Sequence, residues 1–457
     1  MQRSLLALAV AGAATLPWPA AAADDAEVAR LRADFEQQLH SLRSSYEDRL
    51  KALESRLDSA TGKANASPTA VDRVERPPVN ANSFNPELSL ILQGTYVSRK
   101  SGERRPTGYL QDEEIGASQR GFSLNDTELV IAADIDPYFR GSATIILADD
   151  QAELEEAWFQ TLNLDKGFVL KGGRFISGIG YQNAQHPHSW DFSDNNLMYQ
   201  VLFGEHLVQD GLQLKWLAPI DTFLELGAEI GSGAAFPGSD GDHNDPGAWA
   251  VYGHIGGDVG DTSSWRAGLS YLSAEPRDRA STLIDSSGTE AETSFTGRSK
   301  TWIADFVWKT APDGNPKDRN FKLQAEFFQR DESGDLTCLD NSAEGGACLA
   351  DTTAAYRADQ TGWYAQGIWQ FMPRWRVGLR YDRLNQGSLD YGINDAALSS
   401  GSYDPNKWTL MTDYAPSEFS LIRLQLARNH AMADNPDNSE ISLQYIYSMG
   451  AHSAHSF

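Results

Sequence analysis

From residue 84 onward, apolar and polar residues alternate with a period of two. Each alternating segment therefore has one apolar face and one polar or mixed face, which predicts half-buried antiparallel strands. In a soluble sandwich the polar face would meet water, whereas in a membrane barrel the apolar face meets lipid and the polar face lines the lumen. The clearest apolar series are Phe321, Leu323, Ala325 and Phe327; Trp375, Val377, Leu379 and Tyr381; Trp408, Leu410 and Tyr414; and Ile441, Leu443, Tyr445 and Tyr447.

The connections between these segments favour the barrel. Short links with turn residues, such as Asp136-Pro137, Asp165-Lys166-Gly167 and Met372-Pro373-Arg374, alternate with long polar links. Short turns on one side and long loops on the other are typical of outer-membrane barrels. The expected long loops are 98–118, 177–209, 232–246, 275–298, 331–357, 385–405 and 431–439. We expect sixteen strands, beginning near residues 84, 119, 138, 153, 167, 210, 221, 247, 264, 299, 320, 358, 375, 406, 418 and 440.

The first 83 residues follow other patterns. Residues 1–23 carry Arg3, an apolar stretch and an Ala-rich end, which predicts a cleaved secretory signal. In residues 24–59 apolar positions repeat every 11 residues, which predicts a nearly straight helix that associates as a coiled coil, expected to be trimeric. The alternative is a single amphipathic helix that lies on the barrel or the membrane. Residues 60–83 are rich in Pro, Ala and Asn and are expected to be a linker. The barrel is then expected over 84–457, with the arm in the periplasm.

Composition narrows the class of protein. The formal net charge of −25 argues against a nucleic-acid partner, which requires a basic surface. The 12 Trp and 16 Tyr suit the aromatic girdles of a membrane barrel. The chain has two cysteines, Cys338 and Cys348, ten residues apart in a polar stretch. After export to an oxidising compartment, we expect them to form a disulfide within one loop.

Two local motifs lie within this architecture. Leu170-Lys171-Gly172-Gly173-Arg174-Phe175 runs into Gly178-Ile179-Gly180, and Asp210-Gly211-Leu212-Gln213-Leu214-Lys215-Trp216 follows the third long loop. With the signal, arm and sixteen strands, they make the chain resemble the phosphate-selective porin O and P family. The resemblance implies a homotrimeric outer-membrane channel whose third external loop, here 177–209, folds into the lumen.

The third loop departs from that family in its charges. Phosphate-selective members line the constriction with Arg and Lys, and residues 177–209 contain neither. A loop with three carboxylates and no permanent cation should favour cations or polar neutral solutes. The residues expected at the constriction are His186, His188, Trp190, Asp191, Asp194, Glu205 and His206.

Charges of both signs fall on the lumen-facing parity of the strands. Such a mixed lumen resembles a general porin, although each charge is more simply a salt bridge within the barrel wall. The basic positions are Arg140, Lys215, Arg266, Lys322, Arg376, Arg380, Lys407 and Arg423. The acidic positions are Glu128, Asp134, Glu225, Glu229, Asp305, Glu326, Asp382 and Asp413.

Other chemistry is weakly indicated. His186 and His188, and separately His452 and His455, have spacings that can hold a transition metal, but ordinary hydrogen bonding is the simpler use, so no metal or cofactor is expected. Ser189 lies beside His188 and Asp191, yet adjacency in one loop is poor geometry for a triad, and no enzyme is expected.

The sequence therefore predicts an outer-membrane channel through which small hydrophilic solutes or ions diffuse passively. The alternatives are a phosphate or other anion channel, a structural tether acting through the coiled coil, and a metal-ion uptake channel.

Overall fold

The structure is a computed structural model, and it describes residues 86–100, 106–112, 120–124, 127–148, 151–399, 401–433 and 438–450. The expected signal 1–23, coiled coil 24–59 and linker 60–83 lie outside the described residues, as do His452 and His455. Among the described helices, none is long and apolar enough to cross a membrane.

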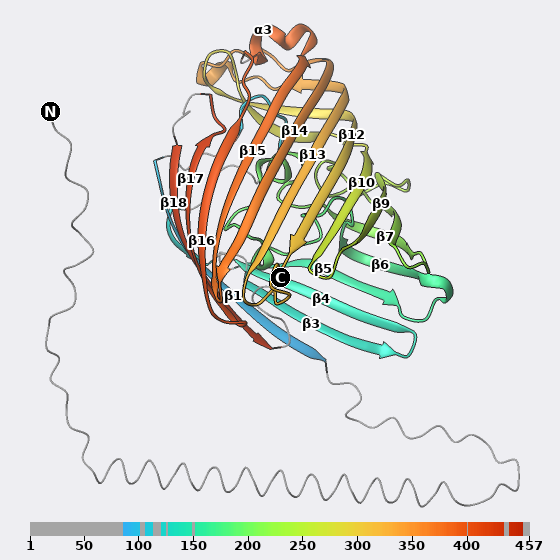
Figure 1. Ribbon diagram of the computed structural model, residues 1–457. Helices are drawn as coiled ribbons and strands as arrows, with labels where there is room; N and C mark the ends of the chain where they lie inside the picture. The colour runs from blue at the N-terminus through green and yellow to red at the C-terminus, as the bar shows by residue number, and fades with distance from the viewer. Residues whose placement is uncertain are drawn as a thin grey trace, which may run out of the picture. The chain divides into compact units, whose positions relative to one another are not determined.

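Antiparallel strands make up nearly all of the described chain (Figure 1). The strands are β1 (Glu87–Arg99), β2 (Gly121–Leu124), β3 (Thr127–Asp136), β4 (Phe139–Ala148), β5 (Gln151–Thr161), β6 (Phe168–Ile176), β7 (Val208–Leu217), β8 (Phe223–Gly231), β9 (Ala248–Val259), β10 (Ser263–Ala274), β11 (Arg279–Ile284), β12 (Glu290–Thr310), β13 (Asn320–Cys338), β14 (Thr352–Met372), β15 (Trp375–Asp390), β16 (Asn406–Ser417), β17 (Ser420–His430) and β18 (Asn438–Gly450). The helical segments are η1 (Asp165–Gly167), η2 (Pro187–Ser189), α2 (Leu197–Phe203), η3 (Ser342–Glu344), η4 (Gly392–Asn394) and α3 (Asp395–Leu398).

The sheet closes on itself, because β1 pairs with β18 on one side and with β2 and β3 on the other. In the described chain the eighteen strand segments form sixteen barrel strands. β2 and β3 together form one barrel strand, which pairs with β1, and β10 and β11 together form another, which pairs with β12. The predicted sixteen-stranded antiparallel barrel is therefore confirmed.

The two faces of the wall differ as the alternation predicts. Along β16, Trp408 and Leu410 are exposed on the outer face, whereas Lys407 and Thr409 are buried on the inner face. β18 repeats the pattern, with exposed Leu443 and Tyr445 beside buried Gln444. An apolar exterior around a polar interior is the reverse of a soluble core and is what a lipid-embedded barrel requires.

Local turn chemistry explains why the short links form. At the β3–β4 link, Asp136 Oδ1 accepts hydrogen bonds from the backbone N–H groups of Tyr138 and Phe139, at 2.7 and 2.9 Å. At the β14–β15 link, Arg374 adopts a φ of 72°, which closes the turn. These hairpins fix the register of the strands on either side.

The strands differ greatly in length. β12, β13 and β14 contain 21, 19 and 21 residues, whereas β3, β4 and β6 contain 10, 10 and 9. Figure 1 shows the long strands running toward α3 while β3–β6 form the shorter part of the wall. The barrel wall is therefore tall on one side and low on the other.

On the tall side of the wall, three segments that were predicted as loops are partly strand. Residues 275–298 contain β11 and the beginning of β12. The expected loop 331–357 is strand up to Cys338 and again from Thr352, and β15 continues to Asp390. These segments are polar and rich in Gly, Ser and Asp because they extend past the apolar belt, so their composition resembled that of loops.

Candidate functional site

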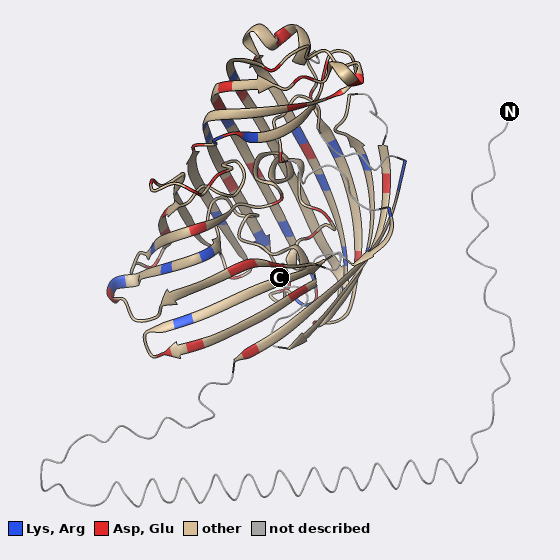
Figure 2. Ribbon diagram, turned by 180° about the vertical axis from the view of Figure 1, so that it is seen from behind, with Lys and Arg blue, Asp and Glu red and all other residues tan. Residues whose placement is uncertain are grey.

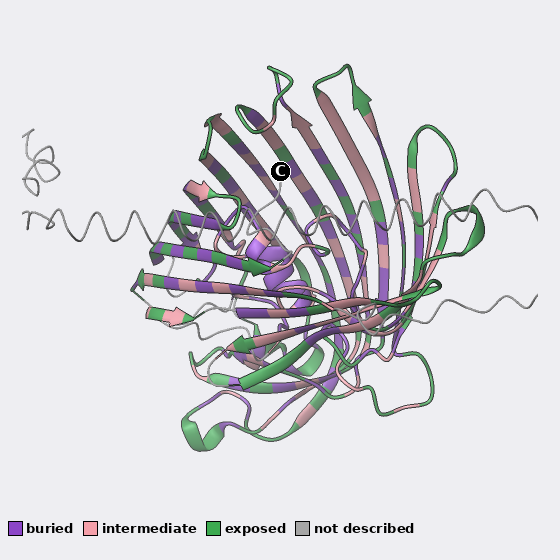
Figure 3. Ribbon diagram, turned by 90° about the horizontal axis from the view of Figure 1, so that it is seen from below, coloured by how far each residue is buried: buried purple, intermediate pink, exposed green. Residues whose placement is uncertain are grey.

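The third loop, predicted over 177–209, covers residues 177–207 because β7 begins at Val208, and it lies inside the barrel between β6 and β7 (Figure 3). Its helix α2 has Asn196 as N-cap, with the side chain accepting from the Tyr199 N–H, and Gly204 as a left-handed C-cap. All seven residues of α2 are buried. In Figure 3 the helix coloured as buried lies within the ring of strands.

The apolar side of this loop packs on the inside of the wall. Met198, Val201, Leu202 and Phe203 belong to one buried cluster that also contains residues of the wall. The wall residues of the cluster include Ala250, Tyr252, Leu272, Ile303, Phe328, Tyr364 and Leu384. The hydrophobic core of the molecule thus lies within the barrel and fixes the loop in place.

Glu326 on β13 anchors both halves of the loop. It accepts from the backbone N–H of Gln182 at 2.9 Å and from the Tyr199 hydroxyl at 2.9 Å. Tyr364 on β14 also donates to it, at 2.6 Å. Because Glu326 is 2% exposed, these donors replace the water that it would otherwise need.

Asp191 is one of two loop carboxylates that bind basic residues of the wall. Lys322 Nζ lies 2.5 Å from Asp191 Oδ2, and Arg376 Nη1 lies 3.3 Å from Asp191 Oδ1. Burial would raise the pKa of Asp191, but the charges of Lys322 and Arg376 outweigh it and hold the pKa below its ordinary value. Asp191 is therefore a neutralised anchor.

Asp194 is the second anchor. Arg380 Nη2 lies 3.1 Å from Asp194 Oδ1, and Lys407 Nζ contacts Asp194 Oδ2. Gln425 on β17 donates to the same carboxylate at 2.9 Å. Asp191 and Asp194 are therefore both paired with basic side chains of the wall, among the charges that the sequence analysis places on the lumen-facing side of the strands.

The three histidines of the loop meet three glutamates of the low wall. We call Glu128, Glu155, Glu156, His186, His188 and His206 the His–Glu cluster. His186 Nδ1 lies 3.0 Å from Glu155 Oε2 and 3.7 Å from Glu128 Oε2, and His186 Nε2 lies 3.4 Å from Glu156 Oε2. His188 Nδ1 lies 2.8 Å from Glu128 Oε1, and His206 Nε2 lies 3.3 Å from Glu155 Oε1.

The carboxylates of this cluster decide the charge of His186. Burial would lower its pKa, but Glu155, Glu156 and Glu128 together raise the pKa well above its ordinary value. The rings of His186 and His188 stack, with centroids 5.8 Å apart and planes 18° apart, so the η2 turn presents both imidazoles to the wall.

A β-bulge delivers two consecutive glutamates to the cluster. Thr144 on β4 pairs with Glu156, and the next residue, Ile145, pairs with Leu154, so Glu155 is the extra residue. In a regular strand neighbours point to opposite faces, whereas here Glu155 and Glu156 are both buried. Redirecting a side chain is a common use of a bulge.

The remaining predicted site residues have local roles. Trp190 donates from Nε1 to the carbonyl of Gln185 at 2.8 Å. Glu205 has a φ of 86°, and its carbonyl accepts from Asn195 at 2.6 Å. Cys338 and Cys348 are joined as a disulfide, in the tall part of the wall.

The predicted lumen charges are interspersed along the strands (Figure 2) and are largely paired with one another. Arg376 and Arg423 both bind Asp413, and Arg380 also binds Asp382. The other pairs of the wall are Arg140 with Asp134 and Glu87, Lys215 and His254 with Glu225, and Arg266 with Asp305, while Glu229 accepts from Ser177 and Gln213.

Glu155 and Glu156 were missed as site residues. Their signal is a change of phase in the alternation: Ala152 and Leu154 are outward at even numbers, whereas Ala157 and Phe159 are outward at odd numbers. A phase change of this kind marks an inserted residue and could have located the bulge.

These features define the class: a closed sixteen-stranded antiparallel barrel with an apolar exterior and an internal loop bound to its polar wall. The chain belongs to the same family as a protein of Aquifex aeolicus described as uncharacterized, to which it is 32% identical over 409 residues, covering 83% of this chain and 81% of that one. No protein-family profile matches the sequence, so the resemblance to phosphate-selective porins stays a prediction.

Solved structures of outer membrane proteins are similar to this chain at low sequence identity. A loop-deletion mutant of OmpT, an outer membrane protein of Vibrio cholerae, aligns with 80% of this chain and 99% of its own, at 11% identity and a TM-score of 0.50. OmpT in its trimer form is 10% identical over 80% of this chain and 99% of its own, with a TM-score of 0.49. Pseudomonas putida OprB is 14% identical over 80% of this chain and 94% of its own, with a TM-score of 0.48.

Proposed function

We propose that the chain is an outer-membrane porin through which small hydrophilic solutes or ions diffuse passively, with loop 177–207 as its constriction. The observation that carries the proposal is the attachment of this loop, inside an apolar-faced barrel, to wall strands on opposite sides: to Glu128 on β3 and to Glu326 on β13. A loop held at both sides of the lumen leaves solutes only the space beside it.

Conductance in planar bilayers tests this proposal directly. A porin gives steady, ohmic single-channel steps, and replacing loop 177–207 by a short linker should enlarge them. A folded protein that inserts without conducting would contradict the proposal and favour the structural tether.

For selectivity, we propose a weak preference for cations or neutral solutes. Since the loop carboxylates are paired with wall cations, neither partner offers free charge to a passing ion. A strong anion filter would need Arg or Lys groups without carboxylate partners. Reversal potentials near zero or toward potassium in a salt gradient support this proposal, and a strong reversal toward chloride would favour the phosphate or anion channel.

We further propose a homotrimer that joins through the low wall. On the outer face of this wall, Arg174 and Asp210 form a bidentate ion pair at 2.7 and 2.8 Å, on the same face as the exposed Leu212. A charged pair on the outer face is costly against lipid and is better covered by protein.

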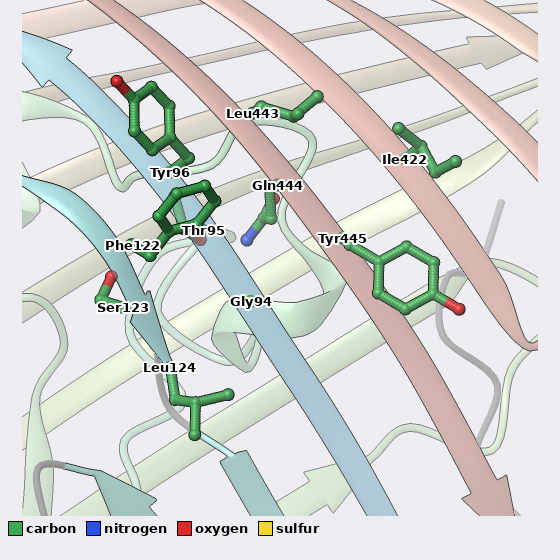
Figure 4. A pocket seen from close by; sticks show the side chains of 10 residues that line it. All are labelled: Gly94, Thr95, Tyr96, Phe122, Ser123, Leu124, Ile422, Leu443, Gln444 and Tyr445. Atoms are coloured by element: carbon green, nitrogen blue, oxygen red, sulfur yellow. The ribbon is translucent and has the colours of Figure 1, made fainter.

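An apolar groove lies elsewhere on the wall, at β1, β2 and β18. It is lined by Tyr96, Phe122, Leu124, Leu443 and Tyr445, from β1, β2 and β18, and Figure 4 shows these side chains around it. In the proposed trimer each barrel meets two other copies, and these cover the groove and the ion pair. Deleting residues 24–59 tests whether the expected coiled coil is also needed: if trimers persist without them, the barrel faces are sufficient.

A further inference from the structure

The His–Glu cluster has the chemistry of a metal site. Imidazole nitrogens and carboxylate oxygens are the donors that zinc-like divalent ions prefer when no thiolate is present. Donor atoms of Glu128, Glu155 and His186 all lie within 4.8 Å of one another. Zinc bonds to such donors measure about 2.0–2.2 Å, so small side-chain rotations bring the three onto one ion.

Unsatisfied atoms point to a missing positive partner at the same place. Glu128 is 0% exposed, and its Oε2 has no hydrogen-bond donor among the described residues. His206 Nδ1 is also buried and has no hydrogen bond among the described residues. A buried carboxylate oxygen without a donor is costly, because it has lost its water and gained no replacement.

Lys and Arg side chains form no ion pair with the glutamates of the His–Glu cluster in the part of the chain that the structure describes. The ion pairs of Glu128, Glu155 and Glu156 there are made with histidines. The loop carboxylates Asp191 and Asp194, by contrast, each bind two basic side chains. The wall therefore pairs its other loop anchors with Lys and Arg and leaves this one to titratable imidazoles.

We propose that the His–Glu cluster binds one zinc-like divalent transition-metal ion, with His186, Glu128 and Glu155 as ligands. His206 lies against Glu155 and can complete the set. The ion takes the place of the imidazole protons and fastens the η2 turn of the loop to β3 and β5. This inference does not depend on conduction, because binding is measured on the folded protein itself.

Titration of Co²⁺ into the purified full-length protein tests the proposal, because bound Co²⁺ has visible absorption bands that report its ligands. We expect one Co²⁺ per chain, displaced by Zn²⁺ and not by Mg²⁺, which prefers all-oxygen octahedral sites. His186→Gln and Glu128→Gln should each weaken binding by about tenfold or more.

Two controls separate this site from other histidines. His243→Gln changes a histidine of the β8–β9 loop that hydrogen-bonds to the Asp240 carbonyl, and it should leave binding unchanged. The double variant His452→Gln, His455→Gln removes the second histidine pair and should also bind normally. Absence of saturable binding, equal binding by His186→Gln, or loss of binding in the double variant would each overturn the proposal. If His186→Gln does not fold, X-ray absorption of the zinc-loaded wild type decides, since it must show imidazole ligands.

Discussion

At the scale of residues, the loop is fixed to the wall by a few well-buried ion pairs. The side chains of Asp194, Arg380 and Lys407 are 9%, 3% and 1% exposed. Removing one partner of a buried pair leaves an uncompensated charge, which costs about 3–5 kcal/mol. The buried pairs of Asp191 and Asp194 therefore contribute more free energy to holding the loop in place than exposed ion pairs do.

We predict that Asp194→Asn loosens the loop and moves selectivity toward anions. The variant removes a carboxylate that both Arg380 and Lys407 bind, so the local charge becomes more positive. Reversal potential in a potassium chloride gradient measures the shift. Asp313→Asn is the matched control, because Asp313 pairs with Arg319 on an exposed turn and should leave the reversal potential unchanged.

The ion pairs of Asp191 predict how stability depends on pH. Its pKa is lowered in the folded state, so it binds its proton less readily than the unfolded chain, where the pKa is about 3.9. Its contribution is therefore fully present above about pH 5 and is lost as the pH falls below about 4.

The difference in unfolding free energy between wild type and Asp191→Asn measures this contribution. It should be constant from pH 7 to pH 5 and shrink on further acidification. A difference that instead disappeared between pH 5 and pH 7 would show that Asp191 does not carry it.

At the scale of elements, α2 is the part of the loop that fills the lumen. All its residues are buried, and its apolar side chains pack on the wall while Tyr199 binds Glu326. A helix of seven residues is not stable alone, so packing must hold it.

We predict that replacing residues 190–203 by a Gly-Ser linker raises single-channel conductance several-fold. The wall strands keep their own hydrogen bonds, so the barrel should still fold. The control is a deletion of similar size in the loop that carries η4 and α3, which should leave conductance unchanged. Equal conductance of the α2 deletion and the wild type would mean that the loop does not limit the passage.

The sequence predicts the strands well because their signals are local. Period-two alternation and turns such as Asp136-Pro137 placed most strands within a few residues of their observed start. Two strands begin earlier than predicted: β12 begins at Glu290 instead of near residue 299, and β14 begins at Thr352 instead of near residue 358. Above the apolar belt both faces of a strand are polar, so alternation of hydrophobicity no longer marks it.

The site was less predictable because its contacts are long-range. His186 and His188 stand out as a pair in the sequence, but their partner Glu128 is about sixty residues away and Glu155 depends on a bulge. Likewise, the residues that neutralise Asp191 and Asp194 come from β13, β15 and β16. Closure of the barrel, rather than any local motif, brings these groups together.

At the scale of the whole molecule, the uneven height of the wall and the outward-facing Arg174–Asp210 pair are explained together by the proposed trimer. The tall strands β12–β15 enclose their own buried cluster beneath the outer loops, with the disulfide within it. Among the described residues, no such cluster includes residues of the shorter strands β3–β6, and the internal loop meets β3 and β5 through the His–Glu cluster. In the proposed trimer, the Arg174–Asp210 pair on the outer face of β6 and β7 is covered by another copy of the chain.

The proposed trimer is tested by two leucines that are alike except for their position. Leu212 on β7 is 50% exposed beside the Arg174–Asp210 pair, and Leu379 on β15 is 49% exposed on the tall wall. A tryptophan is tolerated against lipid but obstructs a close-packed protein interface, so Leu212→Trp should convert trimers to monomers while Leu379→Trp should not. Light scattering in detergent after size-exclusion chromatography measures the mass, and heat-dependent gel migration shows that each barrel is folded. A monomeric wild type would contradict the proposed trimer. Dissociation by Leu379→Trp and not by Leu212→Trp would place the interface on the tall wall instead.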